Sequence, residues 1–95
     1  MFDMTTSGTS VDPLREEQEA LEFQRQIGRN IRHWRIQRAL TAEEFARRSG
    51  KPVATINEIE LGEAMPSVEF LWRAAQVLMV SCLAFTDPQE HRSAA

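Results

Sequence analysis

The chain of 95 residues carries 11 Lys and Arg against 14 Asp and Glu, a net charge of −3, and 42% of its residues are hydrophobic. This length allows one domain with a tail. No apolar run approaches the roughly 18 residues that a membrane span requires, and the first residues lack the basic and apolar regions of a signal peptide. We therefore expect a cytoplasmic protein without a membrane partner.

Residues that could carry catalysis or bind a metal are sparse. The single cysteine, Cys82, cannot form an internal disulfide, and His33 and His91 are too far apart in the sequence to resemble a metal site. The sequence contains neither a glycine-rich phosphate loop nor a set of acid, base and nucleophile. We expect no metal, no cofactor and no enzymatic activity, and we interpret Cys82 as a small buried apolar residue.

Charges are segregated along the chain. Residues 1–22 hold one arginine and six acidic residues, a net charge of −5, whereas residues 23–38 hold five arginines and no acidic residue, a net charge of +5. The arginines recur about every three residues, so they cannot all face one side of a helix. Pairs such as Glu22 with Arg25 would leave part of this run as a solvated helix face. Because phosphate binding depends on local charge, the overall negative charge does not exclude a nucleic acid.

The first predicted element is a long helix that follows a disordered tail over residues 1–12. Asp12 can cap the helix and Pro13 is tolerated at its first position. Residues 13–26 form an acidic helical extension, which either continues unbroken to about residue 38 or breaks softly near Gln24. Gly28 is expected to weaken the helix only modestly. Apolar residues at steps of four, four and three define its buried face: Phe23, Ile27, Ile31 and Trp34.

Three shorter helices are expected over about 42–49, 53–60 and 67–79. Thr41 and Glu44 have the spacing of a capping box, and Gly50 can adopt the left-handed conformation that ends a helix. A last turn over 81–85 precedes a frayed tail over 87–95. No segment alternates with the period of a strand, so the predicted fold is all-α. The inner faces contain Phe45, Ala46, Ile56, Ile59, Leu71, Ala74, Ala75 and Leu78.

An ordered set of residues runs through the predicted domain: Ile27-Gly28, Arg35, Leu40-Thr41, Phe45-Ala46, Gly50, Ile56, Ile59-Glu60, Gly62, Pro66-Ser67 and Leu71. In this order and spacing the sequence resembles the lambda-repressor-like, Xre-type helix-turn-helix family over roughly residues 27–85. The resemblance implies a five-helix domain over 27–86, with the N-terminal helical extension added. It also implies a sequence-specific transcriptional regulator, a dimeric repressor that reads the major groove of double-stranded DNA with helix 53–60.

The resemblance places the first turn of that helix against base edges, which implies Pro52, Val53 and Ala54, with Glu58 one turn further on. Val53 and Ala54 can contact thymine methyl groups but form no bidentate hydrogen bonds, so base reading should be sparse and depend partly on DNA shape. The other positions implied to lie at the DNA are Arg38, Thr41, Ala42, Lys51, Thr55 and Asn57. The alternative is a surface helix without a DNA partner.

Two structural roles are implied as well. Arg35 and Glu60 are expected to form an ion pair that braces the motif; the alternative is that both are solvated surface charges. Ala46 must be small because the two motif helices cross there. Trp34 and Trp72 are interpreted as core or interface residues.

Two surfaces are candidates for a homodimer: the fifth-helix region and the extension. The charge of the extension disfavours insertion into a DNA groove, so it would act as a dimer strap or cover its own arginines. The other candidate function is a protein-interaction module on the same fold, either antitoxin-like or a partner of another regulator, with weak or no DNA binding. The candidate dimer residues are Leu14, Leu21, Met79, Val80, Leu83 and Phe85.

Overall fold

A computed structural model describes residues 12–88 of the chain. This part contains no strand, and its elements are α2 (Pro13–Gln37), α3 (Ala42–Ser49), α4 (Val53–Glu60), α5 (Val68–Leu78) and the 3-10 turn η1 (Cys82–Phe85). The all-α class is confirmed, with one difference: the predicted fifth helix is a single 3-10 turn. No described helix has the length and apolar character needed to cross a membrane. The predicted N-terminal tail lies outside the described residues except for Asp12, and the C-terminal tail does so from residue 89 onward.

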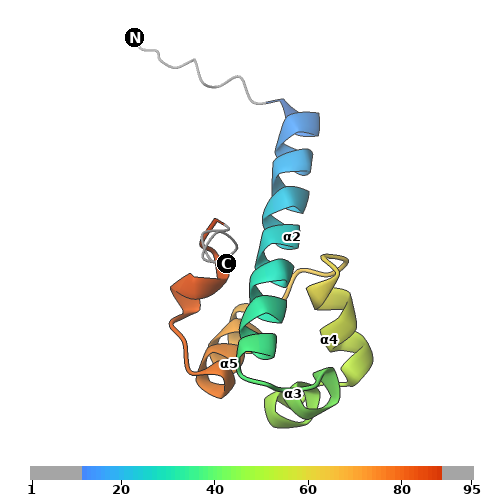
Figure 1. The fold of residues 1–95 in the computed structure, drawn as a ribbon. Helices are drawn as coiled ribbons and strands as arrows, with labels where there is room; N and C mark the ends of the chain where they lie inside the picture. Colours follow the sequence, from blue (N-terminus) through green and yellow to red (C-terminus); the bar gives the residue numbers. More distant parts are fainter. Residues whose placement is uncertain (1–11, 89–95) are drawn as a thin grey trace.

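Helix α2 is one unbroken helix of 25 residues, so the break near Gln24 does not occur. The Asp12 side chain accepts a hydrogen bond from the amide of Leu14 at 3.1 Å, and Pro13 occupies the first turn. Figure 1 shows the N-terminal half of α2 projecting from the molecule, while α3, α4, α5 and η1 gather around its C-terminal half. Burial follows this arrangement, since residues 12–23 are exposed and Ile27 and Ile31 are buried.

The core lies between the C-terminal half of α2 and the shorter helices. Phe45 of α3 and Phe70 of α5 meet edge to face, with ring centroids 6.1 Å apart. Phe70 takes the central position on α5 that the sequence suggested for Leu71, which is only partly buried. The buried apolar residues are Ile27, Ile31, Phe45, Ala46, Ile56, Ile59, Phe70, Ala74, Ala75, Leu78 and Phe85.

Gly28 is where α2 and α4 come closest. A Cβ atom at this position would overlap the carbonyl oxygen of Ile59 and lie 3.1 Å from that of Glu60. The sequence suggested only a modest effect of Gly28 on helix propensity, but the structure shows that its lack of a side chain permits the contact. Helices α2 and α4 can therefore pack this closely only because residue 28 has no side chain.

Asn30 joins α2 to the end of the domain, a role that the sequence did not indicate. Its buried side-chain amide donates hydrogen bonds to the carbonyl oxygens of Phe85 and Asp87, both at 2.8 Å. Asp87, placed by the sequence in a frayed tail, is thus tied to α2. Phe85 is buried, whereas Cys82 is exposed rather than buried as expected.

Candidate nucleic-acid interface

A buried ion pair fixes α4 to α2. Arg35 donates from Nε to Glu60 Oε2 at 2.7 Å and from Nη2 to Oε1 at 3.0 Å. The two side chains are only 11% and 4% exposed. Arg35 also donates from Nη1 to the carbonyl oxygen of Leu40 at 2.7 Å, just before α3. One guanidinium therefore sets the position of α4 and of the turn into α3.

The N-terminus of α3 is capped by Thr41, whose hydroxyl accepts a hydrogen bond from the amide of Glu44 at 3.0 Å. The Glu44 carboxylate accepts hydrogen bonds from Arg47 and Arg48. The predicted capping box is therefore incomplete. Thr41 accepts from the amide of Glu44, but the Glu44 carboxylate bonds to Arg47 and Arg48 rather than back to the amide of Thr41. The hydrogen bonds from Arg47 and Arg48 lower the pKa of Glu44, so its carboxylate stays ionised at neutral pH and offsets part of the positive charge of α3.

Helix α4 presents its outer face to solvent. Ile56, Ile59 and Glu60 are buried, while Ala54 and Glu58 are exposed. Thr55 is half-buried, and the remaining exposed candidates are Pro52, Val53 and Asn57. The predicted surface positions thus lie on one element held from behind by the ion pair.

The N-terminus of α4 differs from those of the other described elements. Pro52 is its N-cap and makes no side-chain hydrogen bond, whereas each of the other N-caps accepts one from a backbone amide. The first amides of a helix carry partial positive charge and need a partner. The first amides of α4 have no side-chain acceptor, so they can donate hydrogen bonds to an acceptor from outside the protein.

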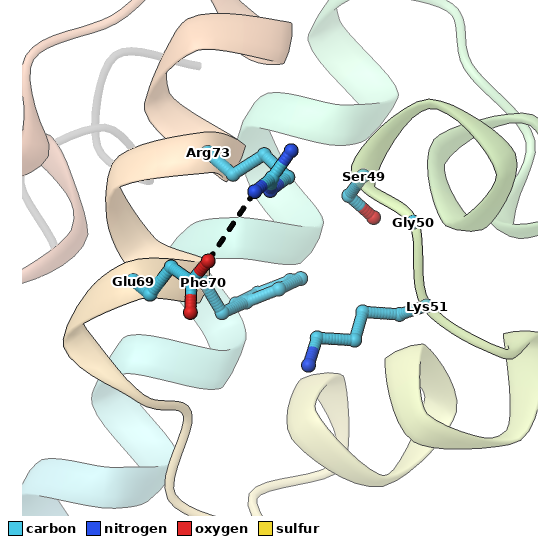
Figure 2. Close-up of a pocket in the computed structure, with 6 residues that line it drawn as sticks. All are labelled: Ser49, Gly50, Lys51, Glu69, Phe70 and Arg73. Atoms are coloured by element: carbon cyan, nitrogen blue, oxygen red, sulfur yellow. Dashed lines mark hydrogen bonds and ion pairs between the residues drawn. The ribbon is translucent and has the colours of Figure 1, made fainter.

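Lys51 lies directly before α4, beside a cavity of about 270 Å³. Figure 2 shows its side chain reaching across the space between the α3–α4 turn and α5. Within residues 12–88 every arginine is engaged by a carboxylate or a carbonyl oxygen, and Lys51 is the one side-chain cation without such a partner. The cavity is lined by Ser49, Gly50, Lys51, Glu69, Phe70 and Arg73.

Arg38 contacts the C-terminal end of α5. Its Nε donates to the carbonyl oxygen of Leu78 at 2.6 Å, and Nη2 donates to that of Met79 at 3.4 Å. The guanidinium also lies over the ring of Trp34, 5.1 Å from the centroid. Arg38 therefore caps the C-terminus of α5, where a cation is favoured, and two of its nitrogen atoms donate within the protein.

The candidate dimer residues fall into two classes. Phe85 is a core residue, so its assignment to a dimer surface is wrong, and Val80 packs partly against the core. Met79 and Leu83 are 74% and 73% exposed, and Leu14 and Leu21 of the extension are 69% and 44% exposed. Both surfaces therefore retain exposed apolar side chains. Trp72, which the sequence analysis interpreted as a core or interface residue, is exposed on α5.

Residues 31–85, more than half of the chain, match the helix-turn-helix family HTH_3. An uncharacterized HTH-type transcriptional regulator of Bacillus subtilis, YazB, is 36% identical over 63 residues, which are 66% of this chain and 91% of YazB. An HTH_3 family transcriptional regulator from Vibrio cholerae shares the fold with a TM-score of 0.64 and 32% identity over 68% of this chain, which spans only 36% of that protein. The restriction-modification controller protein C.AhdI from Aeromonas hydrophila shares the fold with a TM-score of 0.62 and 21% identity, covering 64% of this chain and 92% of its own.

Proposed function

Because the chain belongs to the HTH_3 family of helix-turn-helix proteins, we propose that it is a cytoplasmic, sequence-specific regulator of transcription that binds double-stranded DNA with α4. The observation that carries this proposal is the uncapped start of α4 beside the free ammonium group of Lys51. Both features offer positive charge to a phosphate, and the Arg35–Glu60 pair holds the helix rigidly behind them.

In the proposed complex, phosphates are contacted by Lys51, by Asn57 and by the first amides of α4. Val53 and Ala54 contact thymine methyl groups in the major groove, and Glu58 accepts from a cytosine amino group. Thr41, Ala42, Pro52 and Thr55 border this surface. We infer that the protein acts as a dimeric repressor, since two copies read two half-sites about one helical turn apart.

A second candidate function is supported by the surroundings of α4. Leu61, Met65 and Val68 follow or flank the helix with exposed apolar side chains, and Glu58 and Glu63 add negative charge that repels phosphate. Such a mixture suits a protein partner better than a duplex. The second candidate is therefore a protein-interaction module on the same fold.

The salt dependence of duplex binding distinguishes the two functions. Each phosphate contact lowers the logarithm of the binding constant by about 0.9 for each tenfold rise in salt concentration. With phosphates bound through Lys51, the Lys51→Ala variant loses affinity and its salt slope is smaller by about one contact. Fluorescence anisotropy of labelled duplex DNA across salt concentrations measures this slope.

Arg48→Ala is the matched control because it removes one positive charge outside the proposed DNA surface, from a side chain that Glu44 already pairs with at 2.9 Å. We expect this variant to keep the slope of the unmodified protein. Equal slopes for the Lys51→Ala variant and the unmodified protein would contradict the placement of phosphate at Lys51. Absence of salt-dependent binding altogether would favour the protein-interaction module.

A further inference from the structure

We propose that the outer face of α4 recognises 5-methylcytosine in duplex DNA. The methyl group of Ala54 contacts the C5-methyl group of the base, and the carboxylate of Glu58 accepts a hydrogen bond from its N4 amino group. This inference rests on the proposed function and deepens it, because it names the base that α4 prefers and assigns the preference to two side chains.

Ala54 and Glu58 lie at the centre of the side of α4 that points away from the domain. The buried side of the helix carries Ile56, Ile59 and Glu60. Successive residues of a helix turn by about 100°, so the opposite side carries Ala54 and Glu58, and both are exposed. A duplex that approaches this side of the helix therefore meets an alanine methyl group and a carboxylate.

The carboxylate of Glu58 has no counter-charge. Among residues 12–88, Glu44, Glu60 and Glu69 each form an ion pair with an arginine. Glu58 forms none with any residue of this range, and α4 itself contains no lysine or arginine. A carboxylate that loses its water in a DNA groove needs a hydrogen-bond donor in exchange. The base opposite Glu58 must therefore present a donor.

The two side chains are close enough to contact one base. Residues four apart on a helix have Cβ atoms about 5–6 Å apart, and each side chain leaves the helix tilted toward the N-terminus. The side chain of Glu58 therefore starts toward the turn that holds Ala54. The C5 position and the N4 amino group of a cytosine are neighbours on the major-groove edge, so one base can meet both side chains.

The four ordinary bases match only part of this pair. Guanine presents two acceptors to the major groove, and thymine presents an acceptor beside its methyl group, so each sets an oxygen atom against the carboxylate. Adenine and cytosine offer an amino group but no methyl group for Ala54. Asn57, the only side-chain amide of α4, is assigned to phosphate in the proposed complex. The base that offers both an amino donor and a methyl group is 5-methylcytosine.

Pyrimidine substitution tests the two contacts separately. The full-length protein first recovers its site from a randomised duplex pool in which 5-methylcytosine replaces cytosine. Fluorescence anisotropy then compares cytosine, 5-methylcytosine and thymine at each methylated position of that site. At the contacted base, cytosine should bind about fourfold more weakly than 5-methylcytosine, because one buried methyl group is lost. Thymine should bind about tenfold more weakly, because an oxygen atom replaces the amino group.

Variants of the two side chains should each remove one preference. Glu58→Gln carries an amide that can donate or accept, so its preference for 5-methylcytosine over thymine should fall to about twofold, while the preference over cytosine stays. Ala54→Gly should show the reverse, with cytosine and 5-methylcytosine within about twofold of each other. Glu63→Gln is the matched control because it neutralises another exposed glutamate, beyond the end of α4. It should keep both preferences, and circular dichroism verifies that each variant is helical.

The proposal is overturned if no position of the recovered site prefers 5-methylcytosine over both cytosine and thymine. It is also overturned if Glu63→Gln changes the preferences as much as Glu58→Gln does. A protein that binds duplex DNA without these preferences contradicts only the assignment of the base. A protein that binds no duplex, with or without methylated cytosine, contradicts the DNA function on which the assignment rests.

Discussion

Replacing Arg35 with alanine is expected to destabilise the domain by about 3–5 kcal/mol, because the Glu60 carboxylate would remain buried without its counter-charge. The side chain of Glu60 is 4% exposed, so water cannot take the place of the guanidinium without opening the contact between α2 and α4. The carbonyl oxygen of Leu40 would lose its hydrogen bond as well. Urea unfolding followed by circular dichroism measures the change in the free energy of unfolding.

Arg32→Ala provides the matched control. Arg32 also approaches Glu60, but at 3.9 Å and with a side chain that is 59% exposed, so its loss should cost no more than about 1 kcal/mol. Replacing both members of the buried pair, Arg35→Met with Glu60→Leu, should cost clearly less than Arg35→Ala, since no charge is left buried. If Arg35→Ala and Arg32→Ala had similar small effects, the ion pair would not be the brace of the motif.

Gly28→Ala is expected to be the other strongly destabilising substitution, at about 3 kcal/mol or more, although alanine is the better helix former. The new methyl group would overlap the backbone carbonyl of Ile59, which cannot rotate away as a side chain could. Helix α4 would have to move away from α2, and the Arg35–Glu60 pair would be strained. Thermal and urea unfolding of the variant measure the loss.

Gly50→Ala separates this effect from backbone strain. Gly50 has φ 74° and an added Cβ atom would meet nothing within 4 Å, so its replacement should cost only about 1–2 kcal/mol for the left-handed conformation. Gly28 is helical and has no such strain, so its cost comes from the contact alone. A Gly28→Ala variant as stable as the unmodified protein would show that α2 and α4 do not approach as closely as described.

The sequence predicted the elements well because their ends are set by local chemistry. Asp12, Thr41 and Ser67 accept hydrogen bonds from the amides they precede, and Gly50 and Gly62 adopt positive φ values. Each of these helix-end features involves residues that are close together in the sequence, so the ends of the helices can be predicted before the fold is known. The boundaries of α3 and α4 therefore agree with the expected 42–49 and 53–60.

Roles that depend on contacts between distant segments were harder to predict. The resemblance implied that Arg38 lies at the DNA, but it did not indicate that the C-terminus of α5, forty residues away in sequence, supplies acceptors for its guanidinium. Asn30 lies on the buried face of α2, three residues after Ile27, but its position in the sequence does not reveal its bonds to Phe85 and Asp87, more than fifty residues away. The steric role of Gly28 was missed because it arises from the backbone of another helix. Which residues contact DNA remains a prediction.

The most direct test of the DNA-reading role of α4 is selection of bound duplexes from a randomised pool by the full-length protein and by its Ala54→Gln variant. We expect the unmodified protein to recover a two-fold symmetric motif. Because glutamine can bond adenine in the major groove, the variant should change one position in each half-site toward adenine and leave the remaining positions unchanged. Random recovery, or an identical motif for both proteins, would contradict the account that α4 enters the major groove.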